Sequence, residues 1–319
     1  MTIPADSASE QTTGASNRQK IVPHLWFGKE AEEAVAFYTS LFPDSVTGDV
    51  ARYSAAGQEI HGQEPGTVMT VDFRLAGTRF LALNGGPHFK FTPATSFFVL
   101  CDSAEEVDRL WERLVDGGTA LMELGSYDWS ERYGWVQDRF GLSWQLFLGD
   151  RQEAGQKVVP CLLFTGAEPR AQAAMDLYTS VFPNSGVDIV SPHPAGGPLE
   201  GMVAHAQFRL DGEIFAAMDG GPDHHFTFNE AISLLVECED QAEIDHYWER
   251  LGEGGDPAAR QCGWLKDHFG VSWQITPKIL GRMMVDEDRN KVDRVTNAFM
   301  PMKKLDIAQL EAAYRGDEA

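Results

Sequence analysis

Cysteine is scarce and scattered in this chain of 319 residues, since its four cysteines, Cys101, Cys161, Cys238 and Cys262, form no C-x-x-C pair. Such usage is typical of free thiols in a reducing compartment. No apolar run approaches the roughly 20 residues that a membrane-spanning helix needs. The N-terminus also lacks the charged and apolar regions of a secretory signal. We therefore expect a cytoplasmic protein with no membrane partner.

Positive charge is also in short supply. The chain has 26 Lys and Arg against 48 Asp and Glu, for a formal net charge of −22. So acidic a protein repels phosphate backbones, so we expect no nucleic-acid partner. Hydrophobic residues make up 43% of the chain, which is enough for sizeable cores. The length favours two domains over one.

The chain repeats itself in tandem. FYTSLFPDS at 37–45 returns as LYTSVFPNS at 177–185, and YGWVQDRFGLSWQ from Tyr133 returns as CGWLKDHFGVSWQ from Cys262. We place copy one at 21–150 and copy two at 157–278, with a short polar joint between them. Residues 1–20 are polar and aperiodic, which predicts a disordered tail. Residues 279–319 have no counterpart in copy one and predict a helical extension interrupted near Pro301.

Each copy contains the same elements twice: a strand, a helix and three further strands. The spacing of apolar residues predicts a helix from about residue 31 and another after Ser103. Ser103 and Glu106 form a capping box ahead of that second helix, and Asp240 and Glu243 take the same places in copy two. The chain therefore holds four β-α-β-β-β units and belongs to the α+β class.

These units resemble the building block of the vicinal-oxygen-chelate superfamily, which includes glyoxalase, bleomycin-resistance and dioxygenase proteins. More narrowly, LWFGKEAEEAVAFYTSLFPDS, ALNGGPHFKF and GW-x-x-D-x-F-G-x-SWQ resemble the PhnB-like family that carries the label "3-demethylubiquinone-9 3-methyltransferase". The resemblance covers both copies. It implies two tandem glyoxalase-like domains, each made of two units that form a curved half-barrel sheet with helices on the outside.

The resemblance also implies a divalent metal held by four inward-facing side chains, from the first, fourth, fifth and eighth strands of a domain. Alternation of side chains along the strands assigns these positions. They are His24, Ala82, Ser96 and Gln145 in copy one, and Cys161, Ala217, Ser233 and Gln274 in copy two. Neither set contains a carboxylate, whereas a catalytic zinc site needs about three protein ligands. We therefore expect no bound cofactor, with a divalent metal as the less favoured alternative.

Apolar and aromatic side chains beside a few polar ones predict a small-molecule pocket, although a filled half-barrel core fits the same pattern. The candidate pocket residues are His24, Trp26, Asn84, Ser96, Phe98, Trp135, Gln145, Cys161, Asp219, Ser233 and Gln274. Among them, Asp219 beside a Gly-Gly-Pro turn also fits a turn-stabilising role. Cys161 is the one inward-facing thiol.

We expect a protein that binds a small organic molecule, as a monomer with paired domains or as a homodimer. A metal-assisted isomerase, lyase or oxygenase is the alternative function. No G-x-G-x-x-G loop stands between a strand and a helix, so methyl transfer from a nucleotide-like donor is not expected. A structural role for the C-terminal helices, which would cover a sheet or join chains, is a third possibility.

Overall fold

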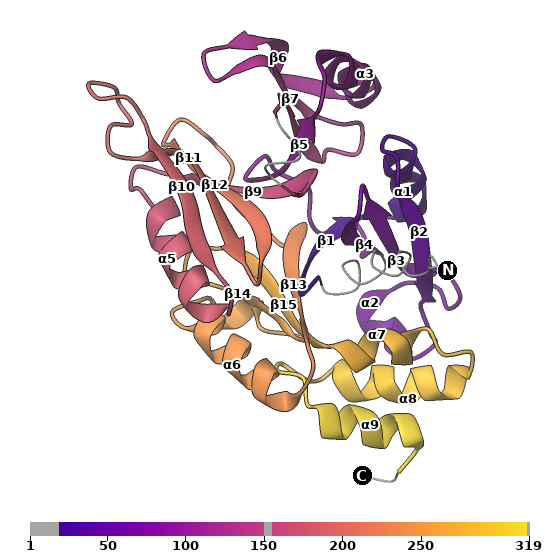
Figure 1. Cartoon of the computed structure of the whole chain (residues 1–319). Coiled ribbons are helices and arrows are strands. Elements are labelled where there is room, and N and C mark those ends of the chain that lie inside the picture. Colours follow the sequence, from indigo (N-terminus) through magenta and orange to yellow (C-terminus); the bar gives the residue numbers. More distant parts are fainter. Residues whose placement is uncertain (1–18, 150–154, 318–319) are drawn as a thin grey trace, which may run out of the picture.

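The computed structural model of the chain describes residues 19–149 and 155–317 and contains four units in succession (Figure 1). Copy one has the expected strands and helices, with one short extra helix, α2. Its elements are β1 (Ile21–Phe27), α1 (Ala31–Thr39), β2 (Val46–Arg52), α2 (Gln58–His61), β3 (Val68–Leu75), β4 (Thr78–Asn84), β5 (Thr95–Cys101), α3 (Ala104–Val115), β6 (Thr119–Tyr127), β7 (Ser130–Gln137) and β8 (Ser143–Leu148).

Copy two repeats this order without a counterpart of α2 and with one strand fewer in its last unit. A 3₁₀ turn (Pro257–Ala259) stands where copy one has β6, because the segment between Trp248 and Trp273 is shorter than its counterpart. The elements are β9 (Val158–Thr165), α5 (Ala171–Val181), β10 (Gly186–Pro192), β11 (Val203–Leu210), β12 (Glu213–Gly221), β13 (Ile232–Cys238), α6 (Gln241–Gly252), β14 (Trp264–Lys266) and β15 (Ser272–Pro277). The α+β class predicted from the sequence is confirmed.

The strands form two mixed sheets, and each sheet takes one unit from each copy. Sheet A has seven strands in the order β14-β15-β13-β1-β4-β3-β2, and sheet B has eight in the order β10-β11-β12-β9-β5-β8-β7-β6. Within each sheet the units from the two copies join by an antiparallel pair, β1 with β13 in sheet A and β5 with β9 in sheet B. The sequence predicts that the two units of one copy share a sheet, whereas in the structure they belong to different sheets.

The helices explain this exchange. The two units of one copy meet through their helix-covered faces and share one hydrophobic core, so their sheets cannot also join edge to edge. In copy one, Tyr38 of α1 packs against Trp144 of β8 with ring centroids 5.3 Å apart. In copy two, Tyr178 of α5 packs in the same way against Trp273 of β15, at 5.2 Å. Each copy therefore builds one hydrophobic core from its own two units, whereas each sheet is built from both copies.

The motif D-x-F-G-x-SWQ builds a tight turn at the edge of each core. Asp138 Oδ1 accepts from the backbone N–H groups of Phe140 and Leu142, at 2.8 and 3.0 Å, and its Oδ2 accepts from the indole of Trp144 at 2.9 Å. Gly141 supplies the positive φ that closes the turn. Burial is the main cause that raises the pKa of Asp138. Asp138 therefore stabilises the turn between β7 and β8.

The capping boxes form as predicted. Ser103 Oγ accepts from the backbone N–H of Glu106 at 3.2 Å, and Asp240 Oδ1 accepts from that of Glu243 at 2.9 Å. These contacts satisfy N–H groups that the first turn of each helix would otherwise leave unpaired. They also hold Glu106 and Glu243 in matching positions, each beside the strand pair that joins the two copies within a sheet.

The C-terminal residues form three helices: α7 (Lys278–Met284), α8 (Arg289–Phe299) and α9 (Ile307–Arg315). Helix α8 ends just before Pro301, as the sequence predicts. The three helices pack around Val292, Val295 and Leu310, and against Ala51 of β2 and Met69 of β3. They therefore cover part of sheet A, next to α2 (Figure 1). Among the described residues, none of the helices has the length and apolar character to cross a bilayer.

The predicted tail and joint fall largely outside the described residues. Gln19 and Lys20, at the end of that tail, do hold defined positions ahead of β1. The side-chain amide of Gln19 exchanges two hydrogen bonds with the backbone of Arg79, at 2.7 and 3.0 Å. Gln156 makes the equivalent pair of contacts with the backbone of Ile214 ahead of β9. The repeat therefore begins two residues before each first strand.

Candidate functional site

Three polar side chains, contributed by both copies, meet on the face of sheet A that is turned away from helices α1 and α6. His24 comes from β1, Ser233 from β13 and Gln274 from β15, and all three are buried. The antiparallel register of β1 and β13 sets His24 directly opposite Ser233. We call these three residues, with the cavity beside them, site A.

Gln274 is the centre of the hydrogen bonding in site A. Its amide nitrogen lies 2.5 Å from His24 Nδ1 and 2.8 Å from Ser233 Oγ. If the amide of Gln274 presents its nitrogen to the ring, His24 Nδ1 accepts and the imidazole carries its proton on Nε2. Burial lowers the pKa of His24 to about 4, which keeps the ring neutral at pH 7. Site A therefore contains a neutral imidazole whose Nδ1 is hydrogen-bonded to Gln274.

The equivalent face of sheet B contains Ser96, Gln145 and Cys161, which we call site B. Ser96 stands opposite Cys161 across the β5–β9 join. Gln145 Nε2 donates to Ser96 Oγ at 2.8 Å, and the hydroxyl of Tyr133 donates to Gln145 Oε1 at 2.5 Å. The sequence places His24 with Ser96 and Gln145, and Cys161 with Ser233 and Gln274. The structure exchanges these partners, because the sheets join across the two copies.

Cys161 is fully buried in site B. It packs with Val159, Ile214 and Ala216 in a small apolar cluster. Burial raises the pKa of its thiol to about 12, so the group is protonated at pH 7. A thiol in this state is a poor nucleophile. The inward-facing thiol singled out in the sequence is therefore part of an apolar floor.

A cavity of about 1000 Å³ lies beside site A. Sheet A forms one wall through His24, Gln274 and Trp264, together with the apolar side chains Met69, Leu81, Leu83 and Leu235. The C-terminal helices and the residue that follows α8 form another through Leu280, Met284, Phe299 and Met300. The wall from the C-terminal helices has no counterpart in copy one, so the sequence repeat alone does not indicate it.

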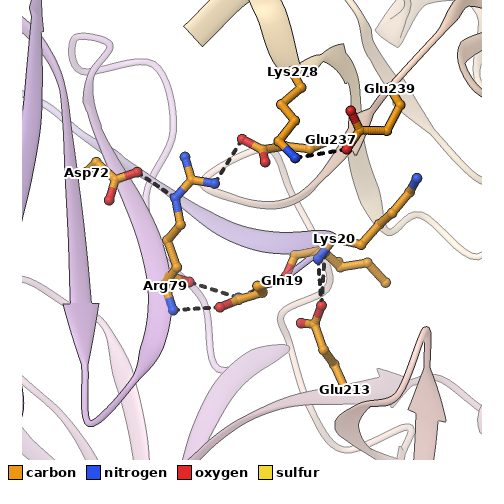
Figure 2. Close-up of polar contacts among 9 residues, drawn as sticks. Gln19, Lys20, Asp72, Arg79, Glu213, Glu237, Glu239 and Lys278 are labelled. Atoms are coloured by element: carbon orange, nitrogen blue, oxygen red, sulfur yellow. Dashed lines mark hydrogen bonds and ion pairs between the residues drawn. The ribbon is translucent and has the colours of Figure 1, made fainter. Parts of the chain in front are cut away.

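One end of the cavity is charged, and its charges are paired with one another (Figure 2). Arg79 of β4 forms ion pairs with Asp72 at 2.6 Å and with Glu237 at 2.8 Å. Burial acts to lower the pKa of Arg79, but the two carboxylates outweigh it and raise the pKa. Nearby, Lys278 pairs with Glu239 at 2.8 Å. Of these pairs, Arg79–Glu237 links copy one to copy two at this end of site A.

The charged end distinguishes site A from site B, and the aligned repeat contains the signal for it. Ile214 takes the place of Arg79 in copy two, Gln207 that of Asp72, and Leu100 of copy one that of Glu237. A partly buried group of paired charges therefore stands where the other sheet has two aliphatic side chains and an amide. A comparison of charge at matched repeat positions finds this difference without a structure.

The predicted inward position of Asn84 is wrong. Asn84 Oδ1 accepts from the backbone N–H of Ala31 at 2.9 Å, at the start of α1, so its side chain lies on the helix side of the sheet. Asp219 caps α5 in the same way, through the N–H groups of Arg170 and Ala171 at 2.8 and 3.0 Å. Both residues accept hydrogen bonds from backbone N–H groups at the start of a helix. A short polar residue at a strand end, matched in both copies, is the signal that indicates this role.

The same shift by one residue applies along β4 and β12. Ala82 and Ala217, which the sequence places at metal-ligand positions, lie fully buried in the helix-packed cores. Leu81 and Leu83 instead line the cavity. On β4 and β12, the positions where the resemblance implies a metal ligand therefore carry aliphatic side chains.

Three aromatic candidates lie at other places on the sheets. The indole of Trp26 donates to Gly86 O at 2.8 Å, and its ring packs against Phe89 with centroids 5.0 Å apart. Phe98 packs beside the apolar floor of site B. The indole of Trp135 donates to Ser143 Oγ at 2.7 Å, also on sheet B. The tryptophan that lines the cavity is Trp264, the copy-two counterpart of Trp135.

The residues of both sites fit a divalent metal poorly. Site A offers one imidazole, a hydroxyl and a neutral amide, and site B offers a buried protonated thiol in place of the imidazole. Zinc sites use about three nitrogen, sulfur or carboxylate ligands, and hard cations need charged oxygen donors. The described part of the chain contains no group of three or more His, Cys, Asp or Glu residues placed to hold a metal ion.

Comparisons with solved structures find similar proteins. The PhnB protein of Bacillus cereus is 41% identical over 41% of this chain and 100% of its own, with a TM-score of 0.38. A variant of glyoxalase I from Zea mays is 10% identical over 79% of this chain and 89% of its own, with a TM-score of 0.50. A comparison with curated proteins found no match.

The maize enzyme spans both copies, so the tandem glyoxalase-like architecture predicted from the sequence is confirmed. The family described as 3-demethylubiquinone-9 3-methyltransferase matches twice, at residues 19–147 and 156–276. Its two matches coincide with the two copies and leave the C-terminal helices outside. The chain therefore belongs to this PhnB-like family and carries two copies of its domain.

Proposed function

We propose that the protein binds a small organic molecule in the cavity of site A. The observation that carries this proposal is a cavity of about 1000 Å³ whose apolar walls surround the His24 and Gln274 side chains. Small-molecule sites are typically concave and mostly apolar, with a few placed polar groups, and reach about 1,000 Å³. Site B, whose polar groups bond to one another, supports such a role less well.

We further propose that this binding needs no divalent ion and that the molecule is not methylated. The single imidazole of site A already accepts a hydrogen bond at Nδ1, and no carboxylate joins it. For a methyl donor, the chain lacks a glycine-rich loop between a strand and a helix. Metal-assisted chemistry, the alternative function for this superfamily, would require ligands that neither site brings together.

A screen of small molecules by thermal shift, followed by calorimetry, tests the proposal on the intact protein. We expect compounds that raise the melting temperature and bind with one site per chain, in the presence of a chelator as in its absence. Elemental analysis of protein purified without a metal-binding tag should find well below one metal ion per chain. One firmly held divalent ion per chain would contradict the metal-free part of the proposal.

A matched pair of variants locates the binding. Leu83 lines the cavity, and its counterpart on sheet B is Met218. In Leu83→Trp a large ring occupies the cavity, so we expect about tenfold weaker binding or more, because the ligand loses the volume that its site must enclose. Met218→Trp should leave the affinity unchanged. Equal effects of the two substitutions would place the ligand elsewhere.

A further inference from the structure

Gln145 of site B and Gln274 of site A differ in how many ends of the side-chain amide are hydrogen-bonded. In site B the amide of Gln145 is used at both ends, because Nε2 donates to Ser96 Oγ and Oε1 accepts from the hydroxyl of Tyr133. The phenol of Tyr133 is buried at this contact, and its oxygen lies 2.5 Å from the amide oxygen. Site B therefore contains its own phenol donor.

Site A lacks that donor, because the counterpart of Tyr133 is Cys262. The thiol of Cys262 lies 3.3 Å from the carbonyl oxygen of Met300, and its backbone N–H donates to Met302 O at 2.8 Å. Both groups are thus engaged by the C-terminal segment. Among residues 19–149 and 155–317, Gln274 Oε1 has no hydrogen-bond donor, although its side chain is only 7% exposed and lines the cavity.

We propose that the ligand of site A carries a phenol-type hydroxyl that donates to Gln274 Oε1, in the role that Tyr133 has in site B. This inference rests on the proposed function and names its ligand class. Gln274 lines the cavity and its Oε1 has no protein donor, so a ligand without a donor would bury this oxygen unpaired, whereas a ligand hydroxyl avoids that cost. The arrangement in site B shows that this fold accommodates a phenol against this amide.

The surroundings of Gln274 suit the rest of such a ligand. Trp264, Phe299 and Met300 line the same cavity and provide flat or adaptable apolar surfaces for an aromatic ring. His24 adds a second polar contact, since its Nε2–H has no acceptor among the described residues. The oxygen of a hydroxyl that donates to Gln274 can accept from a neighbouring N–H. A hydroxylated aromatic compound therefore meets both free polar groups of site A.

Three bicyclic probes test the inference on the intact protein: 2-naphthol, 2-methoxynaphthalene and naphthalene. At pH 7 the naphthol is neutral and donates a hydrogen bond, while its methyl ether keeps the ring and oxygen without the donor. We expect 2-naphthol to bind about tenfold more tightly than the ether or the hydrocarbon, because each of these leaves Gln274 Oε1 buried and unpaired.

Two matched variants assign the effect to one amide. In Gln274→Met the preference for 2-naphthol over its ether should disappear, whereas in Gln145→Met it should persist. Equal affinities for the three probes in the intact protein would overturn the phenol inference and leave small-molecule binding in place. Failure of all three to bind, while other compounds do, would also overturn it. Failure of every compound in the wider screen would overturn the proposed function itself.

Discussion

His24 and Cys161 occupy the same position in the two copies, and burial keeps both of them neutral at pH 7. The ring of His24 is 4% exposed and Cys161 is fully buried. Removal from water disfavours the charged form of either group, so the pKa of the imidazole falls and that of the thiol rises. Each site therefore presents a neutral, fixed side chain beside its glutamine.

The lowered pKa of His24 predicts how stability depends on pH. The unfolded chain binds a proton at this histidine below about pH 6.5, whereas the folded chain binds it only below about pH 4. The contribution of His24 is thus present above about pH 6.5 and is lost as the pH falls towards 4, by about 3 kcal/mol in total. Denaturant unfolding between pH 7 and 4 measures this loss.

The variant His24→Phe isolates that effect. Other groups titrate in the same range, and Glu213, whose pKa burial raises to about 8, contributes with the opposite sign as the pH rises. We expect the difference in unfolding free energy between the wild type and the variant to shrink as the pH falls from 6.5 to 4. A difference that stays constant over this range would mean that His24 does not titrate as its burial indicates.

At the scale of elements, two lysines connect the units that belong to different copies. Lys20, just before β1, pairs with Glu243 of α6 at 2.6 Å, and Lys157, just before β9, pairs with Glu106 of α3 at 2.8 Å. Lys157 is the more deeply buried, with a side chain 2% exposed against 13% for Lys20. The same contact therefore occurs twice, with the lysine side chain exposed to a different extent in each.

This difference predicts unequal effects of equal substitutions. Lys157→Met leaves Glu106 without its buried partner and should lower the free energy of unfolding by about 3 kcal/mol. Lys20→Met removes a more exposed pair, and we expect a loss of about 1 kcal/mol or less. Urea unfolding at pH 7 measures both. A larger loss in Lys20→Met than in Lys157→Met would contradict the role assigned to burial.

Strand faces were predictable where the two faces differ in polarity. On β8, Ser143 and Gln145 alternate with Trp144 and Leu146, and Gln145 lies on the inward face as expected while the apolar pair lies in the helix-packed core. On β4 both faces are apolar, because Phe80 and Ala82 alternate with Leu81 and Leu83. Alternation then contains no contrast that could tell the core face from the cavity face. The side of the sheet on which β4 places Ala82 is decided instead by the start of α1, which Asn84 caps.

At the scale of the whole molecule, each copy completes the sheets of the other. The inner edges of β1 and β5 pair with β13 and β9, so either copy alone would leave two strand edges unpaired. Unpaired strand edges are templates for association with another chain. Since β5 and β13 are equivalent in the repeat, as are β1 and β9, two molecules of copy one could replace the missing partners.

We therefore expect residues 1–150, expressed alone, to form a homodimer in which β1 of one chain pairs with β5 of the other. Analytical ultracentrifugation measures the mass, and the intact chain at the same concentration is the control because its two edges are already paired. A folded, stable monomer of residues 1–150 would show that the join between the copies is not needed for either sheet.

The sequence by itself determined the α+β class, the four units, the tandem repeat and the family, because these depend on local spacing and on motifs that recur along the chain. Only the tertiary structure decided which strands meet. The edges of β5 and β13 carry equivalent patterns, so either could pair with β1, and the packing of helices within each copy makes the choice. That choice unites His24 with Gln274, and the C-terminal helices then enclose the cavity beside them.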